Sequence, residues 1–196
     1  MKVRDSGMPD EATWAGFFDP DTILRQLGLE PTVGDVVEFG CGYGTFTIPA
    51  ARIVDATVYT LDIEPEMIEY TRRRAADAGV DNVQLRLRDF LVTGSGLDDA
   101  SVGYAMVFNI LHIQRPADLL CEAHRVLCPG GLLGLMHWNY DPGTPRGPDM
   151  SFRPRAEECI AAAQQSGFTK VGGLVDLPPY HWGAVLASTR RPMSRR

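Results

Sequence analysis

The stretch VVEFGCGYGT at residues 36–45 decides the fold of this chain. It begins with a nearly all-apolar run, which is typical of a strand covered by helices on both faces of a parallel sheet. Gly40, Gly42 and Gly44 then alternate directly ahead of a predicted helix. Glycine permits positive φ and lets a ligand lie against bare backbone, so the loop is predicted to form the floor of a nucleotide-type pocket. A tight turn without a ligand would also suit these residues, because GxGxG alone is weak evidence.

On both sides of this stretch, short runs rich in Val, Ile, Leu and Ala alternate with helical patterns. Such an alternation predicts a parallel sheet built by right-handed crossovers. Helices are predicted at residues 19–28, 65–79, 119–127 and 154–166, and strands at residues 33–39, 57–61, 83–87, 102–108, 132–137, 168–175 and 183–188.

The end of the chain breaks this alternation. The last two predicted strands are separated only by residues 176–182, which contain Pro178-Pro179 and are too short for a helical crossover. We therefore expect an antiparallel hairpin with a long loop. The predicted fold is an α/β three-layer sandwich with a doubly wound, mostly parallel seven-stranded sheet whose last strand is antiparallel. Residues 1–196 show no repeat or linker and are predicted to form one domain, in which residues 141–154 form a long loop.

Composition narrows the class of protein. The 196 residues are 44% hydrophobic and carry a net charge of -6, which disfavours general nucleic-acid binding. No run of 18 or more apolar residues indicates a membrane span, and the N-terminus lacks the apolar core of a signal peptide. The four cysteines form no CxxC pair and match no zinc framework, so no metal site is predicted. They are interpreted as reduced thiols of a cytoplasmic protein.

Two acidic residues follow the second and third predicted strands. Asp62 lies 18 residues after Gly44, where a carboxylate can accept hydrogen bonds from two ribose hydroxyls. It could instead cap the helix that begins near Pro65. Asp89 could bond the exocyclic amine of an adenine with Phe90 near the ring, and the alternative is a turn aspartate beside a core phenylalanine.

Together these segments resemble the class I S-adenosylmethionine-dependent methyltransferase family. Residues 38–44 resemble its first motif, E/D-x-G-x-G-x-G, while Asp62 and Asp89 match its second-strand and third-strand acids. The sequence FNILH at residues 108–112 resembles the family's fourth-strand exit, and RVLCPGG at residues 125–131 resembles its R-V-L-x-P-G-G turn. The matches occur in the family's order, and the last of them separates this family from dehydrogenases.

The resemblance implies S-adenosylmethionine as cofactor and S-adenosylhomocysteine as product. Glu38 would lie near the cofactor's ammonium, with Gly40 and Gly42 under its methionine part. Asp62 would hold the ribose, and Ile63 would pack on the adenine. The implied cofactor-binding residues are Glu38, Gly40, Cys41, Gly42, Gly44, Asp62, Ile63, Asp89, Phe90 and Asn109.

Two positions at the fourth strand complete the comparison with the family. The resemblance implies that Asn109 lies near the methionine moiety. Many relatives have an aspartate entering the fourth strand, where this chain has Gly103. That departure concerns local packing more than the cofactor.

Residues beyond the cofactor core are candidates for the acceptor side. His112 leaves the fourth strand at the active end of the sheet and is the predicted general base, although it could simply orient a loop. His137, Trp138 and Tyr140 end the fifth strand at the same edge and are predicted to line the acceptor pocket. Methyl transfer is an in-line displacement, so the protein mainly aligns the reactants.

The predicted domain divides by role into three segments. Residues 1–30 would form a helical cap or lid, residues 31–137 the cofactor-binding core, and residues 138–196 the acceptor-side loop, helix and terminal hairpin. Because little chain lies outside the core fold, we expect a small-molecule acceptor rather than a protein or nucleic acid. The sequence predicts neither the acceptor atom nor the oligomeric state.

Three other functions compete with methyl transfer. A dehydrogenase would want a pair such as Tyr-x-x-x-Lys, which is missing from this sequence. A non-catalytic cofactor-binding or protein-interaction module would not need Gly40, Gly42, Asp62 and Asp89 intact. An aminopropyl transferase would need an acidic polyamine site, and none is evident.

Overall fold

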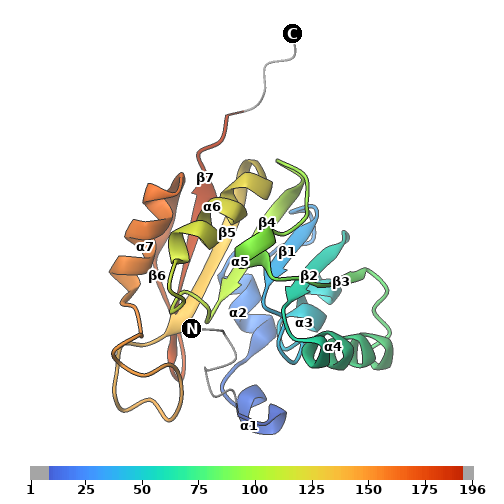
Figure 1. The fold of residues 1–196 in the computed structure, drawn as a ribbon, viewed down its shortest axis with the longest axis horizontal. Coiled ribbons are helices and arrows are strands. Elements are labelled where there is room, and N and C mark those ends of the chain that lie inside the picture. The colour runs from blue at the N-terminus through green and yellow to red at the C-terminus, as the bar shows by residue number, and fades with distance from the viewer. Residues whose placement is uncertain (1–8, 192–196) are drawn as a thin grey trace.

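The chain folds around one seven-stranded sheet in a computed structural model that describes residues 9–191 (Figure 1). The strand order is β3-β2-β1-β4-β5-β7-β6, and β7 runs antiparallel to both of its neighbours. The predicted doubly wound sheet with a reversed last strand is therefore confirmed. The strands are β1 (Val36–Phe39), β2 (Val58–Asp62), β3 (Val83–Leu87), β4 (Val102–Phe108), β5 (Leu127–Trp138), β6 (Phe168–Leu177) and β7 (His181–Ser188).

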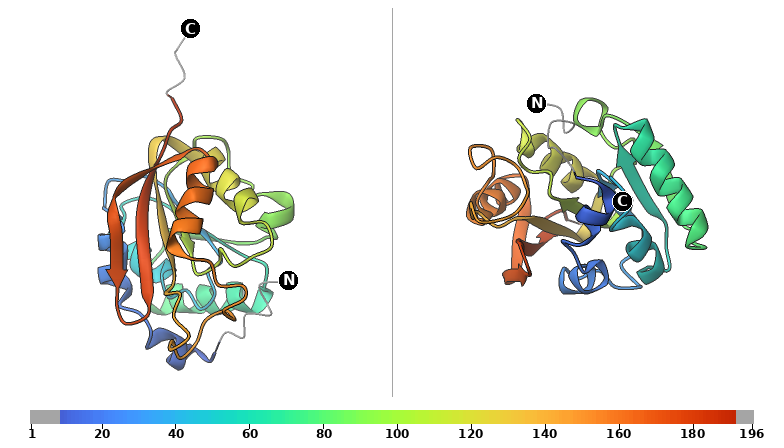
Figure 2. Two further views of the ribbon diagram at one scale, coloured as in Figure 1. Left: turned by 90° about the vertical axis from the view of Figure 1, so that its left-hand side faces the viewer. Right: turned by 90° about the horizontal axis from the view of Figure 1, so that it is seen from below.

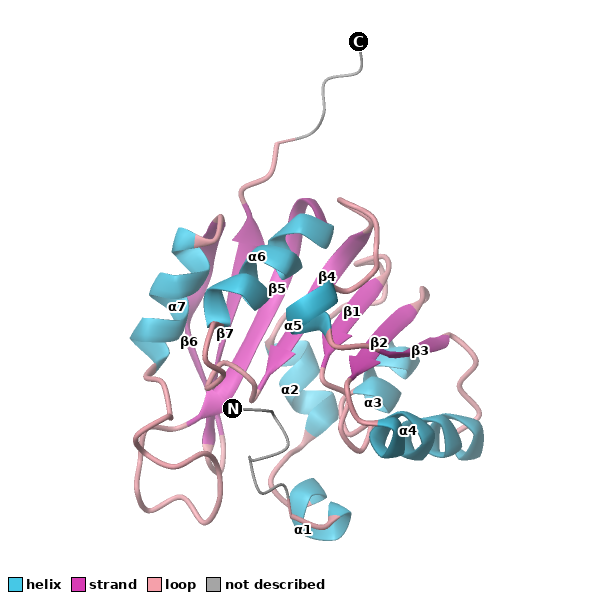
Figure 3. Cartoon of the chain, viewed as in Figure 1, coloured by secondary structure: helices cyan, strands magenta, loops and turns pink. Residues whose placement is uncertain are grey.

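Helices cover both faces of the sheet, as the buried strands require (Figure 2). α2 and α3 lie on one face, while α5, α6 and α7 lie on the other (Figure 3). Within residues 9–191, no helix has the length and apolar composition needed to cross a bilayer. The helices are α1 (Glu11–Ala15), α2 (Pro20–Gln26), α3 (Thr47–Ile53), α4 (Pro65–Asp77), α5 (Phe90–Thr93), α6 (Pro116–Val126) and α7 (Ala156–Gln165).

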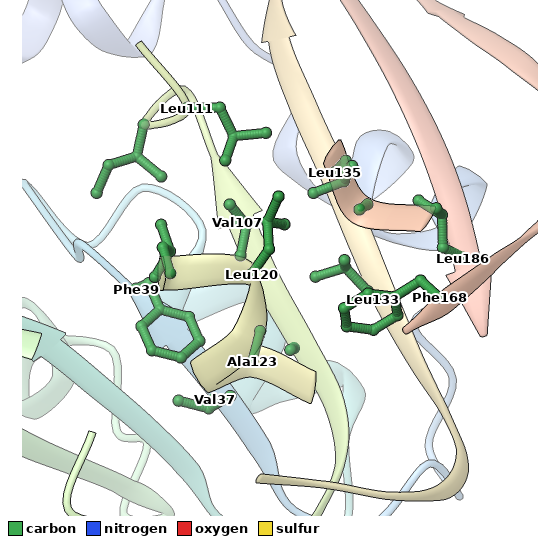
Figure 4. Close-up of a cluster of buried hydrophobic side chains, with 14 of the residues drawn as sticks. Val37, Phe39, Val107, Leu111, Leu120, Ala123, Leu133, Leu135, Phe168 and Leu186 are labelled. Carbon is green, nitrogen blue, oxygen red and sulfur yellow. The ribbon is translucent and has the colours of Figure 1, made fainter. Parts of the chain in front are cut away.

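Each face of the sheet carries its own hydrophobic cluster. Leu120 and Ala123 of α6 pack over Val107 of β4 and Leu133 of β5 on one face (Figure 4). The opposite cluster joins α2 and α3 to the other face of the same central strands. Because β1 and β4 are buried on both faces, the central strands and the loops that leave them have a rigid base.

Gly103 explains the departure from the family pattern at the start of β4. A Cβ atom at this position would lie 1.6 Å from the carbonyl oxygen of Val33. The backbone N–H of Gly103 donates to the carbonyl of Asp35 at 2.8 Å, so the two segments cannot separate freely. Local packing therefore demands glycine where an aspartate was expected.

Several strand boundaries differ from the sequence prediction, and two of the differences change the local structure. β5 begins at Leu127 rather than residue 132, because Leu127 pairs with Val102 ahead of a register shift that accommodates the Pro-Gly-Gly segment. The hairpin loop was predicted to be long, and this was wrong. Pairing continues to Leu177 and His181, which leaves only residues 178–180 for the turn.

Candidate functional site

A cavity of about 770 Å³ opens at the carboxyl ends of the central parallel strands. Loops after β1, β2, β4 and β5 contribute to its wall, together with the N-terminal segment. This edge of a doubly wound sheet is where such folds bind ligands. The volume lies in the upper part of the range of roughly 300–1,000 Å³ that small-molecule sites occupy.

The glycine loop after β1 forms part of the cavity wall. Gly40 and Gly42 both line the cavity and have φ values of +87° and +50°, which glycine adopts without strain. Cys41 between them is buried and also lines the cavity. Gly44, although predicted for this site, lies outside the lining. A Cβ there would come within 2.9 Å of the Thr71 side chain, so Gly44 allows α4 to approach.

Glu38 is a buried carboxyl group at the base of the cavity. The hydroxyls of Thr47 and Thr60 donate to its Oε2 at 2.5 Å and 2.7 Å. No Lys or Arg side chain among residues 9–191 forms an ion pair with it. Burial therefore raises the pKa of Glu38 to about 7. A cationic ligand group beside Glu38 would favour its charged form.

Asp62 closes β2 and faces the glycine loop. Its Oδ2 accepts the backbone N–H of Gly42 and its Oδ1 accepts that of Glu64, each at 3.0 Å. The N-cap of α4 is Glu64, so Asp62 is not that helix's cap. Oδ2 also accepts the Cys41 thiol at 3.7 Å, whereas Oδ1 can accept a further hydrogen bond. Burial raises the pKa of Asp62. Asp62 and its neighbour Ile63 both line the cavity.

Asp89 and Phe90, which follow β3, lie in different surroundings. Phe90 lines the cavity and contacts Phe39 edge-on, with ring centroids 5.4 Å apart. Asp89 is exposed and caps α5 by accepting the backbone N–H of Leu91 at 3.2 Å. Phe90 therefore lines the cavity, whereas Asp89 lies outside the lining. The geometry of Asp89 is that of a turn aspartate, the alternative given in the sequence analysis.

Asn109 and Thr45 show that the cavity suits a polar ligand. Both polar atoms of the Asn109 side chain and the hydroxyl of Thr45 are buried without a hydrogen-bond partner. Both residues line the cavity. The backbone of Asn109 has a φ of +54°, and its N–H donates to the Met136 carbonyl at 2.8 Å. Because buried polar groups in native proteins are rarely unpaired, these atoms fit a ligand that supplies their partners.

Two histidine side chains lie next to each other at the cavity wall. His112 lines the cavity, and its Nδ1 lies 3.4 Å from Nε2 of His137. Burial lowers the pKa of His112 to about 4 and that of His137 to about 3, so both rings are neutral near pH 7. When Nδ1 of His112 carries its proton toward His137, Nε2 of His112 is free to accept a proton. His137 itself is fully buried outside the lining, so its place is behind His112.

Aromatic rings line one side of the cavity. Trp138 and Trp14 both line it, with their ring centroids 6.4 Å apart. Tyr140 is exposed and lies outside the lining, where the guanidinium of Arg155 covers its ring at 3.7 Å. Sequence reasoning missed Phe46, Glu64, Glu66, Met67, Phe108, Arg146, Gly147 and Pro148 on the cavity wall.

Hydrogen bonds and an ion pair with α4 and the glycine loop hold residues 9–15 at the cavity. Glu11 of α1 forms an ion pair with Arg74 at 3.2 Å and accepts a hydrogen bond from the Tyr70 hydroxyl. The Tyr43 hydroxyl donates to the Pro9 carbonyl at 3.0 Å. These contacts agree with a lid, although residues 1–8 of the predicted cap lie outside the described part of the chain.

The fold and site define a class of protein that binds a nucleotide-like ligand at the end of a doubly wound sheet. The model of a family described as a methyltransferase domain matches residues 36–131. A crystal structure described as a SAM-dependent methyltransferase from Aquifex aeolicus superposes with a TM-score of 0.80 and 22% identity, covering 91% of this chain and 94% of that one. At that identity, the likeness establishes the fold alone.

Curated relatives give the same family. Aklanonic acid methyltransferase of Streptomyces sp. (strain C5) is 32% identical over 106 residues, which cover 50% of this chain and 48% of the relative. Nocamycin O-methyltransferase of Saccharothrix syringae is 33% identical over 129 residues, covering 64% of this chain and 45% of the relative. The chain thus spans less than half the length of these relatives. It belongs to the class I S-adenosylmethionine-dependent methyltransferases.

Proposed function

We propose that this chain transfers a methyl group from S-adenosylmethionine to a small-molecule acceptor. The observation that carries the proposal is the set of unsatisfied buried polar groups around the glycine loop. Glu38 lacks a cation, and Asn109 and Thr45 lack hydrogen-bond partners. A cofactor with an ammonium group and several polar atoms would supply the cation and the hydrogen-bond partners that these residues lack.

Each part of the cofactor has a counterpart among the cavity residues. Glu38 would pair with its ammonium, and Asn109 would bond the same methionine part over Gly40 and Gly42. Asp62 would accept the ribose hydroxyls. Ile63 and Phe90 would enclose the adenine. Cys41 would contact the cofactor from between the two glycines, whereas Gly44 would act indirectly by shaping the loop.

Chemistry in this site depends on alignment. When bound, S-adenosylmethionine supplies a methyl group on a cationic sulfur, which keeps the electron pair as the carbon–sulfur bond breaks and the methyl–acceptor bond forms. The chain's own contribution is to hold the acceptor in line and to exclude water with the lid, and orientation supplies roughly 7–11 kcal/mol of barrier lowering. Nε2 of His112 would take the acceptor's proton, with His137 fixing its ring.

Three segments would divide this work. Residues 1–30 would act as cap and lid, residues 31–137 as the cofactor core, and residues 138–196 as the acceptor side. A cavity of about 770 Å³, within the range of small-molecule sites, favours a small acceptor. The relatives named for aklanonic acid and nocamycin support the same choice. Free thiols at all four cysteines support placement in the reducing cytoplasm.

Calorimetric titration with S-adenosylhomocysteine and with S-adenosylmethionine tests the proposal. We expect saturable binding by the wild-type chain and at least about tenfold weaker binding by Asp62→Ala, because a buried acceptor for the ligand's hydroxyls is lost. The control is Asp98→Ala, which removes an exposed carboxylate away from the cavity. Circular dichroism would verify that each variant is folded. Absence of binding by the wild-type chain would refute the proposal and favour a non-catalytic interaction module.

A further inference from the structure

Charge is divided unevenly around the cavity wall. Four acidic residues line the side formed by β1, β2 and the start of α4, namely Glu38, Asp62, Glu64 and Glu66. Within residues 9–191, Arg146 is the one Lys or Arg that lines the cavity. It comes from the loop after β5, on the side where Trp138 lies.

The guanidinium of Arg146 has no partner among residues 9–191. The side chain is exposed, and it forms neither a hydrogen bond nor an ion pair with any other residue in the described part of the chain. Only its backbone carbonyl is used, as an acceptor for Arg153 at 3.2 Å. A guanidinium presents N–H groups in a planar fork that matches a carboxylate bidentately. An unpaired fork on a cavity wall is therefore available to an anionic ligand.

The loop that carries Arg146 is held in place by Arg153. Although it is a cation, Arg153 is only 6% exposed. Its guanidinium donates to the Pro148 carbonyl at 2.9 Å and to the Asn139 carbonyl at 3.0 Å, and it also reaches the Asp141 carbonyl and the Thr144 hydroxyl. These bonds tie both ends of residues 139–153 to one buried group. Arg146 therefore extends from an ordered loop.

Gly147 fixes this loop against the aromatic wall. It has a φ of +111°, and a Cβ there would lie 2.9 Å from the indole of Trp138. The backbone next to Arg146 therefore lies directly on that indole. Trp14 and Phe108 extend the aromatic lining. A flat, apolar ligand body suits such a wall, because large rings bury area with little loss of rotamer freedom.

We propose that Arg146 binds a carboxylate of the methyl acceptor, and that the acceptor is an aromatic or conjugated organic acid whose flat body lies against the half-buried ring of Trp14. The inference deepens the proposed function and rests on it. The acidic residues on the opposite wall favour a singly charged carboxylate over a more highly charged phosphate. His112 is neutral near pH 7 and adds no second cation. The carboxylate is a binding anchor in this assignment.

The test compares acids with their uncharged amides. The probes are benzoate, cinnamate and anthracenecarboxylate with the three matching carboxamides, and their dissociation constants are measured by calorimetry with and without saturating S-adenosylhomocysteine. We expect the wild-type chain to prefer each acid by roughly tenfold or more, the worth of one hydrogen-bonded ion contact. The largest rings should bind best.

Arg146→Met is the decisive variant, and Arg155→Met is its control. Arg155 lies outside the cavity lining over the Tyr140 ring, so its replacement removes the same charge without touching the site. In Arg146→Met, the preference for acids should disappear while amide and S-adenosylhomocysteine affinities change less than about threefold. The control should keep the preference.

Different results would refute this inference and the proposed methyl-transfer function on which it rests. Equal binding of acids and amides by the wild-type chain, or no binding of any acid, would refute the carboxylate anchor. A loss of S-adenosylhomocysteine affinity in Arg146→Met with the acid preference intact would assign Arg146 to the cofactor's own carboxylate. Failure of the wild-type chain to bind S-adenosylhomocysteine would refute the proposed function separately, because the acid and amide titrations are also run without it.

Discussion

The buried carboxyl of Glu38 makes the stability of the ligand-free fold depend on pH, and Glu38→Gln isolates that dependence. Burial raises the pKa of this group from its ordinary value of 4.5 to about 7. The folded protein therefore binds the Glu38 proton more tightly than the unfolded chain does. The contribution to stability is fully present below the unfolded pKa and is lost as the pH rises through the folded pKa.

The magnitude follows from the shift. At about 1.36 kcal/mol per pKa unit, a rise from 4.5 to about 7 corresponds to about 3 kcal/mol of stability, lost once the group is ionised in both states. Between about pH 5 and about pH 8, roughly 2.5 kcal/mol of this loss is expected. Glutamine keeps an oxygen to accept the hydroxyls of Thr47 and Thr60 and does not titrate. The variant should therefore gain stability relative to the wild-type chain as the pH rises.

Urea denaturation at a series of pH values measures this difference. The free energy of unfolding of Glu38→Gln minus that of the wild-type chain should increase by roughly 2.5 kcal/mol between about pH 5 and about pH 8. Glu30→Gln is the control, because Glu30 is an exposed carboxylate far from the cavity lining. A difference that stays flat for Glu38→Gln would refute the reasoning, since it would mean that water or a cation reaches the carboxylate in the ligand-free protein.

Two further predictions concern packing. Gly103→Ala should destabilise the fold by more than about 3 kcal/mol, because its Cβ would lie 1.6 Å from the Val33 carbonyl oxygen, whereas Gly173→Ala meets no atom within 4 Å. Thermal unfolding compares the two, and equal midpoints would contradict the clash. Tyr104→Phe removes a fully buried hydroxyl that donates to the Leu27 carbonyl at 2.7 Å, and should cost about 1–3 kcal/mol in urea denaturation. No change would mean that the carbonyl finds another donor.

The fold was predictable because its information is local. Apolar runs bounded by glycine and proline indicate buried strands, and the alternation of strand and helix restricts the topology to a few arrangements. The antiparallel hairpin was predicted correctly, but its loop was predicted to be too long. Pro178-Pro179 suggested a long loop, whereas Leu177 and His181 on either side of the turn pair with each other. Ladder pairing depends on the partner strand, which composition does not reveal.

That several predicted cofactor-binding residues lie together in the fold was predictable for a similar reason. Glu38 and Asp62 lie near the carboxyl ends of β1 and β2, and Asn109 directly follows β4, so the fold itself carries them to one edge. The spacing of a motif does not fix what each residue contacts, however. Gly44 accommodates Thr71 and Asp89 caps α5, and neither lines the cavity.

The acceptor side resisted prediction because it is assembled by tertiary contacts. Arg146 lies in a Pro/Gly-rich stretch without helical or strand periodicity, and its position depends on the buried hydrogen bonds of Arg153. Trp14 lies at the cavity in a segment held by tertiary contacts, among them the ion pair of Glu11 with Arg74 of α4. Neither set of contacts joins residues at a spacing that predicts it from the sequence. The residues proposed to determine the choice of acceptor are therefore the hardest to identify from the sequence.

The polar groups that weaken the ligand-free fold are the same groups that would recognise its ligands. Glu38 is buried without a cation, Asn109 without hydrogen-bond partners, and Arg146 projects from an ordered loop without an anion. A chain selected for stability alone would replace each of them with an apolar or uncharged residue. Under the proposed function, the cofactor's ammonium satisfies Glu38 and the acceptor's carboxylate satisfies Arg146. Ligand binding should therefore stabilise this protein more as the pH rises through about 7, because Glu38 would otherwise become an uncompensated buried charge.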